Sequence, residues 1–532
     1  MKKIFFGGKK MFTEVKPGFN FCEIERKIRG YWRENNIFEK SVKNRNGQEV
    51  YCFYDGPPTA NGKPHIGHIL TRAIKDLIPR YKTMKGYFVV RKAGWDTHGL
   101  PVELEVEKEL GLDGKEQIEI YGIEKFINKC KESVWKYKSE WENMSECVGF
   151  WADMKNPYIT YENKYIESVW WALKNIWDKN LIYNGFKVVP YCPRCGTALS
   201  SHEVAQGYKD VKEKSLIASF KIKNKDNEYF LAWTTTPWTL PSNVALVVNP
   251  NEKYARVEYK NKIYVVCSAL ADKIFVENYK ILDEIIGKEL EGMDYEPLFS
   301  YDLNNVARNK KNNRAFCVLC DDYVTLTDGT GIVHCSPAFG EDDARVGIKN
   351  NLIFSQPVNE RGCFKENMGD LAGKFVKDAD EIIIKKLDET GKLFACFNYE
   401  HSYPFCWRCD TPLLYYARNS WFIKMTEVRN KLVKNNNKIN WYPDSIKQGR
   451  FGNFLENVVD WGLSRERYWG TPLPIWQCEC GYEHMIGSVE ELKNMCDDDL
   501  SNLELHKPFI DKVFLNCPKC KKKMKRVSEV ID

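Results

Sequence analysis

Apolar residues recur at helical spacing in two stretches near the N-terminus, and each stretch predicts an amphipathic helix. They lie in residues 20–40 (Phe21, Ile24, Ile28, Tyr31 and Trp32) and in residues 66–84 (Ile66, Ile69, Leu70, Ala73, Leu77 and Tyr81). Short apolar runs at 49–54 and 88–90 predict strands on either side of the second helix. The order strand, glycine-bearing loop, helix and strand is typical of a parallel nucleotide-binding sheet.

The pattern changes twice in the rest of the chain. Residues 120–182 have helical spacing and are rich in tryptophan, and we expect these rings to pack a core. Beyond about residue 185, β-rich runs alternate with turn residues and predict an inserted, mostly β domain; the clearest runs are 215–221, 229–233, 254–259 and 262–266. The expected divisions are an N-terminal extension and helix (1–45), the first half of an α/β domain (46–190), the insertion (191–404) and a return to the α/β domain (405–532).

The composition is that of a globular chain. Apolar residues make up 43% of the 532 and charged residues 29%, a balance far from that of disordered proteins. The net charge of +6 permits an RNA partner without demanding one. No apolar run approaches 18 residues, so we expect no membrane span. Residues 1–10 are too weakly apolar for an export signal, and we expect them to be a disordered extension before Met11.

Four short cysteine pairs predict two zinc sites. The chain has 19 cysteines, an odd number that excludes complete disulfide pairing. Cysteines separated by one or two residues are typical of metal ligands in a reducing compartment. One four-thiolate site would close both ends of the insertion, and the other would be a local zinc ribbon; the proposed sets are Cys192, Cys195, Cys406 and Cys409, and Cys478, Cys480, Cys517 and Cys520. Gly196 allows the positive φ that such a turn needs. The alternatives are a pair that has lost its metal, or oxidised pairs.

Cys317 and Cys320 have the same spacing, but apolar residues separate them and no Gly or Pro turn follows. We therefore expect a strand there.

The stretch from Asp55 to His68 is the most informative part of the chain: Asp55-Gly56-Pro57-Pro58-Thr59-Ala60-Asn61-Gly62-Lys63-Pro64-His65-Ile66-Gly67-His68. It lies between a predicted strand and a predicted helix, where backbone amides and the positive helix end attract phosphate. His65 and His68 share one side of the first turn and can donate to phosphoryl oxygens. Gly67 lets a planar base approach the backbone. The alternatives are surface histidines or a metal pair.

This stretch resembles the HIGH signature of class I aminoacyl-tRNA synthetases, and its neighbours resemble the isoleucine-specific members. The matching segments follow in order from about residue 12 to the last residue: Asp55–Gly62, Gly94–Glu103, Trp233–Asn243, Gly329–His334, Gly340–Asp343 and Ser464–Pro472. The resemblance implies a Rossmann-like parallel sheet, incomplete at its C-terminal end, with a large inserted editing domain and zinc knuckles. It also implies a cytoplasmic monomer whose partners are ATP, L-isoleucine and tRNA(Ile).

The resemblance further implies roles for individual residues. Pro64, His65, Gly67 and His68 would bind ATP, with Mg²⁺ assisting the phosphates; Asp96 would hold the substrate ammonium, and Asp55 and Pro57 would border the amino-acid pocket. The residues of the hydrolytic site for Val-tRNA(Ile) would be Thr234, Thr235, Thr236, His334 and Asp343. The alternative for Asp96 is a solvated loop or cap acid. The alternatives for the threonine run and for Asp343 are an ordinary edge strand and an ordinary helix-start acid.

The chain departs from the family in one respect. The Lys-Met-Ser-Lys-Ser signature is absent; Lys424-Met425-Thr426 and Lys523-Met524-Lys525 are superficial matches. We expect an N-terminal portion that is deficient in activating isoleucine but retains some hydrolytic editing. The rival interpretations are a valine-specific class I synthetase and a non-catalytic zinc protein that binds RNA.

Overall fold

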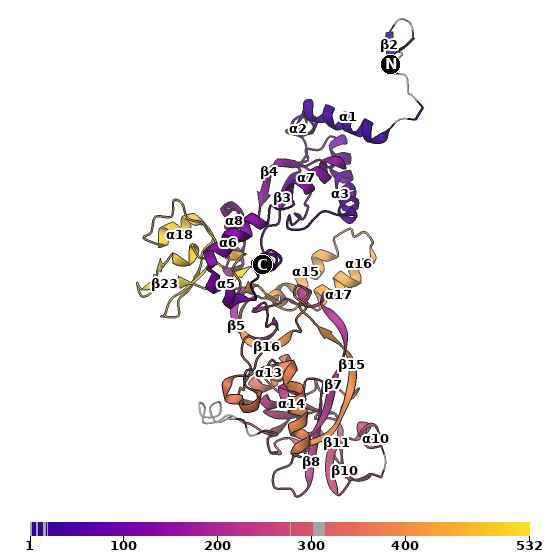
Figure 1. The fold of residues 1–532 in the computed structure, drawn as a ribbon, viewed down its shortest axis with the longest axis vertical. Helices are drawn as coiled ribbons and strands as arrows, with labels where there is room; N and C mark the ends of the chain where they lie inside the picture. The colour runs from indigo at the N-terminus through magenta and orange to yellow at the C-terminus, as the bar shows by residue number, and fades with distance from the viewer. Residues whose placement is uncertain are drawn as a thin grey trace. The chain divides into compact units, whose positions relative to one another are not determined.

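The computed structural model describes residues 3–6, 9–13, 17–18, 20–276, 278–299, 301 and 314–531. The chain divides into two compact units, residues 1–106 with 124–169 and residues 107–123 with 170–532. Figure 1 labels many of their elements. Across the described ranges, none of the helices combines the length and apolar character needed to cross a membrane.

The first unit is built around a short parallel pair of strands, β3 (Lys92–Trp95) and β4 (Asp153–Ile159). The strands approach so closely that a Cβ at Gly94 would lie 2.1 Å from the Tyr158 ring, so only glycine fits there. Trp95 and Trp141 form a buried cluster with Ala60. The helices that begin in or beside this unit are α1 (Phe21–Glu34), α2 (Ile37–Lys43), α3 (Ile66–Met84), α4 (Leu100–Leu110), α6 (Ile123–Ser133), α7 (Lys138–Cys147) and α8 (Asn163–Trp177).

The prediction of strands at 49–54 and 88–90 is wrong, because the two segments form an isolated bridge and no strand. The predicted parallel direction is correct. A single parallel bridge joins Val50 to Phe88, with hydrogen bonds of 3.0 Å from the Tyr51 N–H and 2.9 Å to the Glu49 carbonyl. Prolines, which lack an N–H donor, follow the first segment at positions 57 and 58. The ladder therefore does not extend toward the loop.

Helix α3 coincides with the predicted helix at 66–84, but the other helical predictions are interrupted. The helix expected at 20–40 is split into α1 and α2 at Asn36, which has a φ of 50°. The helical region expected at 120–182 contains β4, reached through Gly149 at a φ of 68°. Trp170 is fully buried as expected, whereas Trp171 is exposed.

The N-terminal residues do not follow the expectation of disorder where they are described. Strands β1 (Lys3–Phe6) and β2 (Lys9–Thr13) pair antiparallel, with Ile4 opposite Phe12. Residues 1–2 and 7–8 lie outside the described residues.

The second unit contains a nine-stranded sheet. Strand β8 pairs in parallel with both β11 and β14, and β9 pairs in parallel with β13. The remaining pairs are antiparallel. The four runs predicted as strands fall in β7, β8, β10 and β11, and the Cys317 segment is a strand, as predicted. The strands are β7 (Tyr208–Lys221), β8 (Glu228–Thr234), β9 (Ala245–Val248), β10 (Lys253–Tyr259), β11 (Lys262–Cys267), β12 (Lys280–Ile286), β13 (Cys317–Cys320), β14 (Ile332–Cys335) and β15 (Leu393–Pro404).

Short helices cover this sheet. Helix α14 (Val376–Glu389) lies beside β7 and β15 in Figure 1, and its residues Val376 and Ile383 share a core with Trp238 of η1 (Pro237–Ser242). The other helices of this region are α9 (Ser201–Val204), η2 (Ser268–Leu270), α10 (Ala271–Ile274), α11 (Gly287–Leu290), α13 (Glu341–Lys349) and η3 (Glu366–Leu371).

A second sheet brackets the insertion in sequence. Strand β5 (Ile182–Cys192) precedes the insertion, β16 (Leu414–Ile423) follows it, and the two pair antiparallel along ten residues. The remaining elements are α5 (Lys115–Tyr121), β6 (Thr197–Ala198), η4 (Met425–Val428), α15 (Arg429–Asn436), α16 (Ser445–Gln448), α17 (Arg450–Glu456), β17 (Trp461–Gly462), β18 (Ser464–Arg465), β19 (Thr471–Pro472), β20 (Ile475–Gln477), β21 (Glu483–Met485), α18 (Val489–Met495), η5 (Ile510–Lys512), β22 (Leu515–Asn516), β23 (Lys523–Arg526) and β24 (Val530–Ile531).

Two buried arginines connect the segment at 464–472 to the start of the insertion. Arg467 pairs with Glu107 at 2.5 Å and donates to the Cys195 carbonyl at 2.8 Å. Arg465 pairs with Glu203 at 2.6 Å. Because an unpaired buried charge is unfavourable, Glu107 keeps Arg467 in place against the first cysteine turn, and Glu203 keeps Arg465 in place against α9.

Candidate functional site

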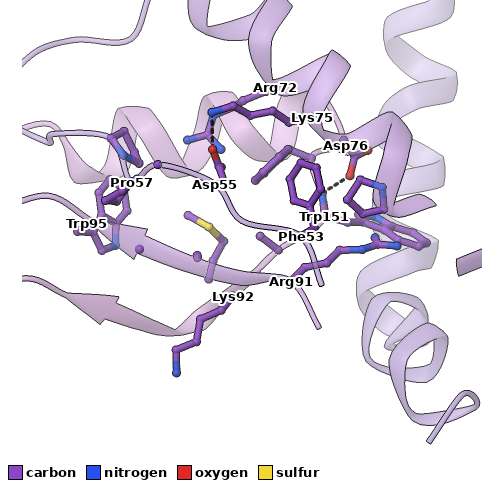
Figure 2. A pocket seen from close by; sticks show the side chains of 18 residues that line it. Phe53, Asp55, Pro57, Arg72, Lys75, Asp76, Arg91, Lys92, Trp95 and Trp151 are labelled. Carbon is purple, nitrogen blue, oxygen red and sulfur yellow. Dashed lines mark hydrogen bonds and ion pairs between the residues drawn. The ribbon is translucent and has the colours of Figure 1, made fainter. Parts of the chain in front are cut away.

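Two adjoining cavities lie where the loop at 55–63 meets the start of α3. They share Asp55, Pro57, Pro58, Arg72 and Lys75 among their lining residues. The cavity drawn in Figure 2 continues past Trp95 and Trp151, whereas the other is lined by His65, His68 and Trp141. The structure therefore brings together the residues expected at the amino-acid pocket and at the phosphates. Pro64 and Gly67 are not among the described residues that line these two cavities.

His65 and His68 cap the helix that they begin. The Nδ1 atom of His65 accepts from the Gly67 N–H at 3.2 Å, and that of His68 accepts from the His65 N–H at 3.0 Å. With Nδ1 acting as an acceptor, a neutral imidazole carries its proton on Nε2. Burial, with the charges of His65, Arg72 and Lys75, lowers the pKa of His68 and favours this neutral form. The cap uses only the acceptor nitrogen of each ring, so each neutral ring keeps its Nε2–H donor for another partner.

Two cations of α3, which the sequence analysis missed, lie in the same cavities. Lys75 forms an ion pair with Asp55, drawn in Figure 2. The buried Arg72 guanidinium stacks over the rings of Trp141 and Phe150, at 5.5 and 4.6 Å. Arg72 and Lys75 follow His68 by four and seven residues, which is a same-side spacing that the sequence does contain.

Asp96 lies one residue beyond the end of β3, as predicted for an acid at a strand end. Its N–H donates to the Pro58 carbonyl at 3.0 Å, and it forms a parallel bridge with Thr59. Asp96 is half-buried. It is not among the described residues that line the two cavities, whereas its neighbours Trp95 and Pro58 are. The structure thus places Asp96 against the loop of the cavities.

The threonine peptide and His334 lie on neighbouring strands of the insertion. Thr234 ends β8, and Trp233 pairs with Val333 of β14, so His334 lies next to Thr234. Thr236 donates through its N–H to the Thr234 hydroxyl at 3.1 Å. Thr235 lies between them at the turn into η1. Burial lowers the pKa of His334 to about 4, so its ring is neutral near pH 7.

Asp343 lies in the first turn of α13 and is tied back to the end of β14. Its carboxylate accepts from the Ser336 N–H at 2.9 Å and from the Tyr323 hydroxyl at 3.2 Å. Burial raises the pKa of Asp343 to about 6. His334 and Asp343 are therefore held at the same end of one strand, and the carboxyl group can change its charge near neutral pH.

The eight cysteines form two groups, paired as the sequence predicts. In each group the four sulfurs lie within 4.8 Å of one another. Individual Sγ–Sγ distances are 3.5 Å for Cys192–Cys409 and 3.3 Å for Cys478–Cys520. A tetrahedral zinc ion with Zn–S bonds of about 2.3 Å would separate its sulfurs by about 3.8 Å. The sulfurs would need only small adjustments to reach this separation, so both groups fit zinc in donor type and spacing.

The turns of these groups share one backbone feature. The residue after the second cysteine of every pair has a positive φ: Gly196, Asp410, Gly481 and Lys521, at 64°, 61°, 81° and 65°. Asp410 and Lys521 adopt this conformation although they are not glycine, which is unfavourable unless the turn is held from outside. Four converging sulfurs around a metal would supply that restraint.

Sequence reasoning also missed residues that support the insertion site. Thr239 and Asn243 both contact the His334 ring, at 2.8 and 3.2 Å. Both residues lie inside the threonine-rich segment 233–243, on which the resemblance rests. The other polar residues of that segment could therefore have been proposed as site residues from the sequence. Tyr295, which contacts Asn243 from 52 residues away, lies outside that segment.

The family model described as tRNA synthetases class I (I, L, M and V) matches residues 27–532. The chain is 57% identical over 522 residues to an isoleucine–tRNA ligase of Clostridium novyi, covering 98% of this chain and 50% of the relative. It is 57% identical over the same length to an isoleucine–tRNA ligase of Clostridium acetobutylicum. It is 52% identical over 510 residues to isoleucine–tRNA ligase 2 of Bacillus cereus, covering 96% and 49%. The chain spans about half the length of the curated relatives it matches.

Proposed function

The chain belongs to the class I tRNA synthetases of the isoleucine, leucine, methionine and valine group, and we propose that it serves isoleucine–tRNA ligation. The proposed reaction joins L-isoleucine to ATP as an adenylate and transfers the acyl group to tRNA(Ile). The observation that carries the proposal is the cavity at the first turn of α3, where two histidines, Arg72 and Lys75 line one space. The similarity to isoleucine–tRNA ligases favours isoleucine over valine as the substrate.

In activation, the isoleucine carboxylate attacks the α-phosphate in line, so the protein contributes positioning and charge stabilisation. His65 and His68 would donate through Nε2 to phosphate oxygens, and Arg72 and Lys75 add positive charge to the same cavity. Asp96 would accept the substrate ammonium, with Asp55 and Pro57 at the pocket wall. The Mg²⁺ that accompanies ATP would neutralise part of the charge on the phosphates. The Pro64–Gly67 backbone would sit against the nucleotide at the helix start.

The insertion would compensate for the limited ability of an apolar pocket to distinguish isoleucine from valine. An apolar pocket gains about 1–3 kcal/mol from one methylene, a magnitude established on this amino-acid pair rather than on this structure. We propose that Val-tRNA(Ile) is hydrolysed at Thr234–Thr236, His334 and Asp343. The threonine groups would bind adenosine and water, the Asp343 carboxylate would hold the valine ammonium, and His334 would help to exclude isoleucine.

The two cysteine groups would hold one zinc ion each in a structural role. Zinc supplies crosslinking there and no part of the reaction. The cysteines of the described residues form no disulfides with one another, which suits a reducing cytoplasmic setting. We propose a monomer that works there with tRNA(Ile).

Activation is tested by isoleucine-dependent pyrophosphate exchange in a synthetase that includes the Lys-Met-Ser-Lys-Ser loop. His65→Ala and Asp96→Ala are each expected to reduce exchange at least a hundredfold, because they remove a phosphate donor and the ammonium partner. His202→Ala, in α9 outside the cavities, is the control and should keep full exchange. Retained exchange in either cavity variant would contradict the assignment. The 532 residues alone, which lack that loop, should fail exchange and still hydrolyse Val-tRNA(Ile).

Hydrolysis should also depend on pH through Asp343. Only the ionised carboxylate can pair with an ammonium, and burial places the pKa of Asp343 at about 6. After subtraction of uncatalysed hydrolysis, kcat/KM for Val-tRNA(Ile) should be level between pH 6 and the pKa of the valyl ammonium, and it should fall about tenfold per pH unit below pH 6. A profile that stays level down to pH 5 would contradict this role for the carboxylate.

A further inference from the structure

A chain of hydrogen bonds connects the threonine peptide of the insertion to its hydrophobic core. It begins at Tyr295, whose side chain is fully buried and whose hydroxyl lies 2.6 Å from Asn243 Oδ1. It passes from the Asn243 amide to His334 Nδ1 at 3.2 Å, and from His334 Nε2 to the Thr239 hydroxyl at 2.8 Å. It ends at the Thr236 carbonyl, which is 2.8 Å from the Thr239 hydroxyl.

The partners of Asn243 determine the direction of this chain. Its Nδ2 also donates to the Ala245 carbonyl at 2.9 Å, and a carbonyl can only accept. The nitrogen end of the amide therefore faces both Ala245 and His334, and the oxygen end faces the Tyr295 hydroxyl. His334 Nδ1 must then be an acceptor, which places the single proton of the neutral ring on Nε2. His334 Nε2–H therefore donates to the Thr239 hydroxyl, and that hydroxyl donates to the Thr236 carbonyl.

We propose that Tyr295 is a positioning residue of the hydrolytic site, which acts by holding the Asn243 amide and thereby the tautomer of His334. The inference rests on the proposed editing function. Without the Tyr295 hydroxyl, the buried Asn243 oxygen loses its donor, and turning the amide gives it an N–H of His334 in exchange for the bond from Nδ2 to the Ala245 carbonyl. His334 then carries its proton on Nδ1, the Thr239 hydroxyl donates to Nε2, and the Thr236 carbonyl loses that hydroxyl while it keeps the Thr239 N–H at 3.0 Å.

A purely structural role for Tyr295 predicts a different result. Its ring packs edge-on against Phe220 and Phe316, with ring centroids 5.4 and 6.0 Å apart. Phenylalanine preserves this packing, so Tyr295→Phe isolates the hydroxyl. The matched control is Tyr416→Phe, because Tyr416 is buried in the same core and its hydroxyl donates to the Val358 backbone at 3.1 Å, outside the chain of hydrogen bonds.

The experiment uses the 532-residue chain labelled with ¹⁵N-histidine. Long-range ¹H–¹⁵N correlation spectra report the tautomer of His334, assigned by its loss in His334→Gln, and hydrolysis of Val-tRNA(Ile) is measured in parallel. Tyr295→Phe should populate the Nδ1–H form and slow hydrolysis about tenfold, while Tyr416→Phe leaves both unchanged. A wild-type His334 pattern in Tyr295→Phe would overturn the proposal, whatever the rate. So would an equal loss of activity in both variants.

If the wild-type chain does not hydrolyse Val-tRNA(Ile), the proposed editing function fails, and the spectra still decide whether Tyr295 controls the ring. Should Tyr295→Phe not fold, Asn243→Asp replaces it. A carboxylate can only accept, so His334 must then carry a proton on Nδ1. An unchanged His334 spectrum in Asn243→Asp would equally overturn the proposal.

Discussion

Cys406→Ser is expected to lower the zinc content from two ions to one per chain and to reduce the melting temperature by about 10 °C or more. Structural zinc sites contribute about 10–16 kcal/mol of apparent binding free energy in small domains, an amount comparable with the stability of a whole domain. In this chain the cluster also holds Asp410 at a positive φ, and Arg467 is anchored on the Cys195 carbonyl. Losing the metal would release these restraints together.

Metal analysis and thermal unfolding followed by circular dichroism measure both effects. Cys517→Ser should also lose one ion, because it belongs to the other group. Cys396→Ser is the control: its thiol lies in β15 and is exposed, so zinc content and melting temperature should not change. A native chain with one zinc ion or none would contradict the two-site proposal.

Asp343→Asn is expected to slow hydrolysis of Val-tRNA(Ile) by two to three orders of magnitude. Asparagine can still accept from the Ser336 N–H, so the loop after β14 should persist while the negative charge is lost. Leaving a bound ammonium without its partner in a buried site costs about 3–5 kcal/mol, and each 1.4 kcal/mol is tenfold in rate.

The neighbouring residue supplies the control. Asp342 belongs to the same helical turn, but its carboxylate is exposed and pairs with Arg345 at 3.1 Å. Asp342→Asn should therefore hydrolyse Val-tRNA(Ile) at the wild-type rate. If Asp343→Asn retained hydrolysis, the carboxylate would not be the ammonium site, and the role carried over from the family would be wrong.

The parts of this fold that depend on the spacing of nearby residues can be predicted from the sequence. The strict apolar period of residues 66–84 predicts α3 to the residue, and the β-branched runs of the insertion predict its strands. The cysteine pairs predict both groups, because metal ligation needs only a short turn and a second pair. Gly196 was recognisable as the residue with a positive φ. Asp410 and Lys521 were not, because aspartate adopts this conformation at only a small minority of positions and lysine more rarely still.

What escaped prediction depends on contacts between distant segments. The strand expected at 49–54 needs a partner, and residues 88–90 provide a single bridge. The capping role of His65 and His68 arises from the local turn, but one wall of their cavity is Trp141, which α7 brings from a distant part of the sequence. Likewise, Asn243 can be selected from its segment, whereas Tyr295 joins it through tertiary packing.

The first cysteine group joins residues about 210 positions apart, on either side of the insertion. A crosslink across a loop of this length removes entropy from the unfolded chain worth about 5 kcal/mol in a chain-entropy model. As long as the metal stays bound, an unfolded insertion remains a closed loop whose two ends are already together. The insertion could then open and refold without separating β5 from β16, which would make its loss of structure a local, reversible event.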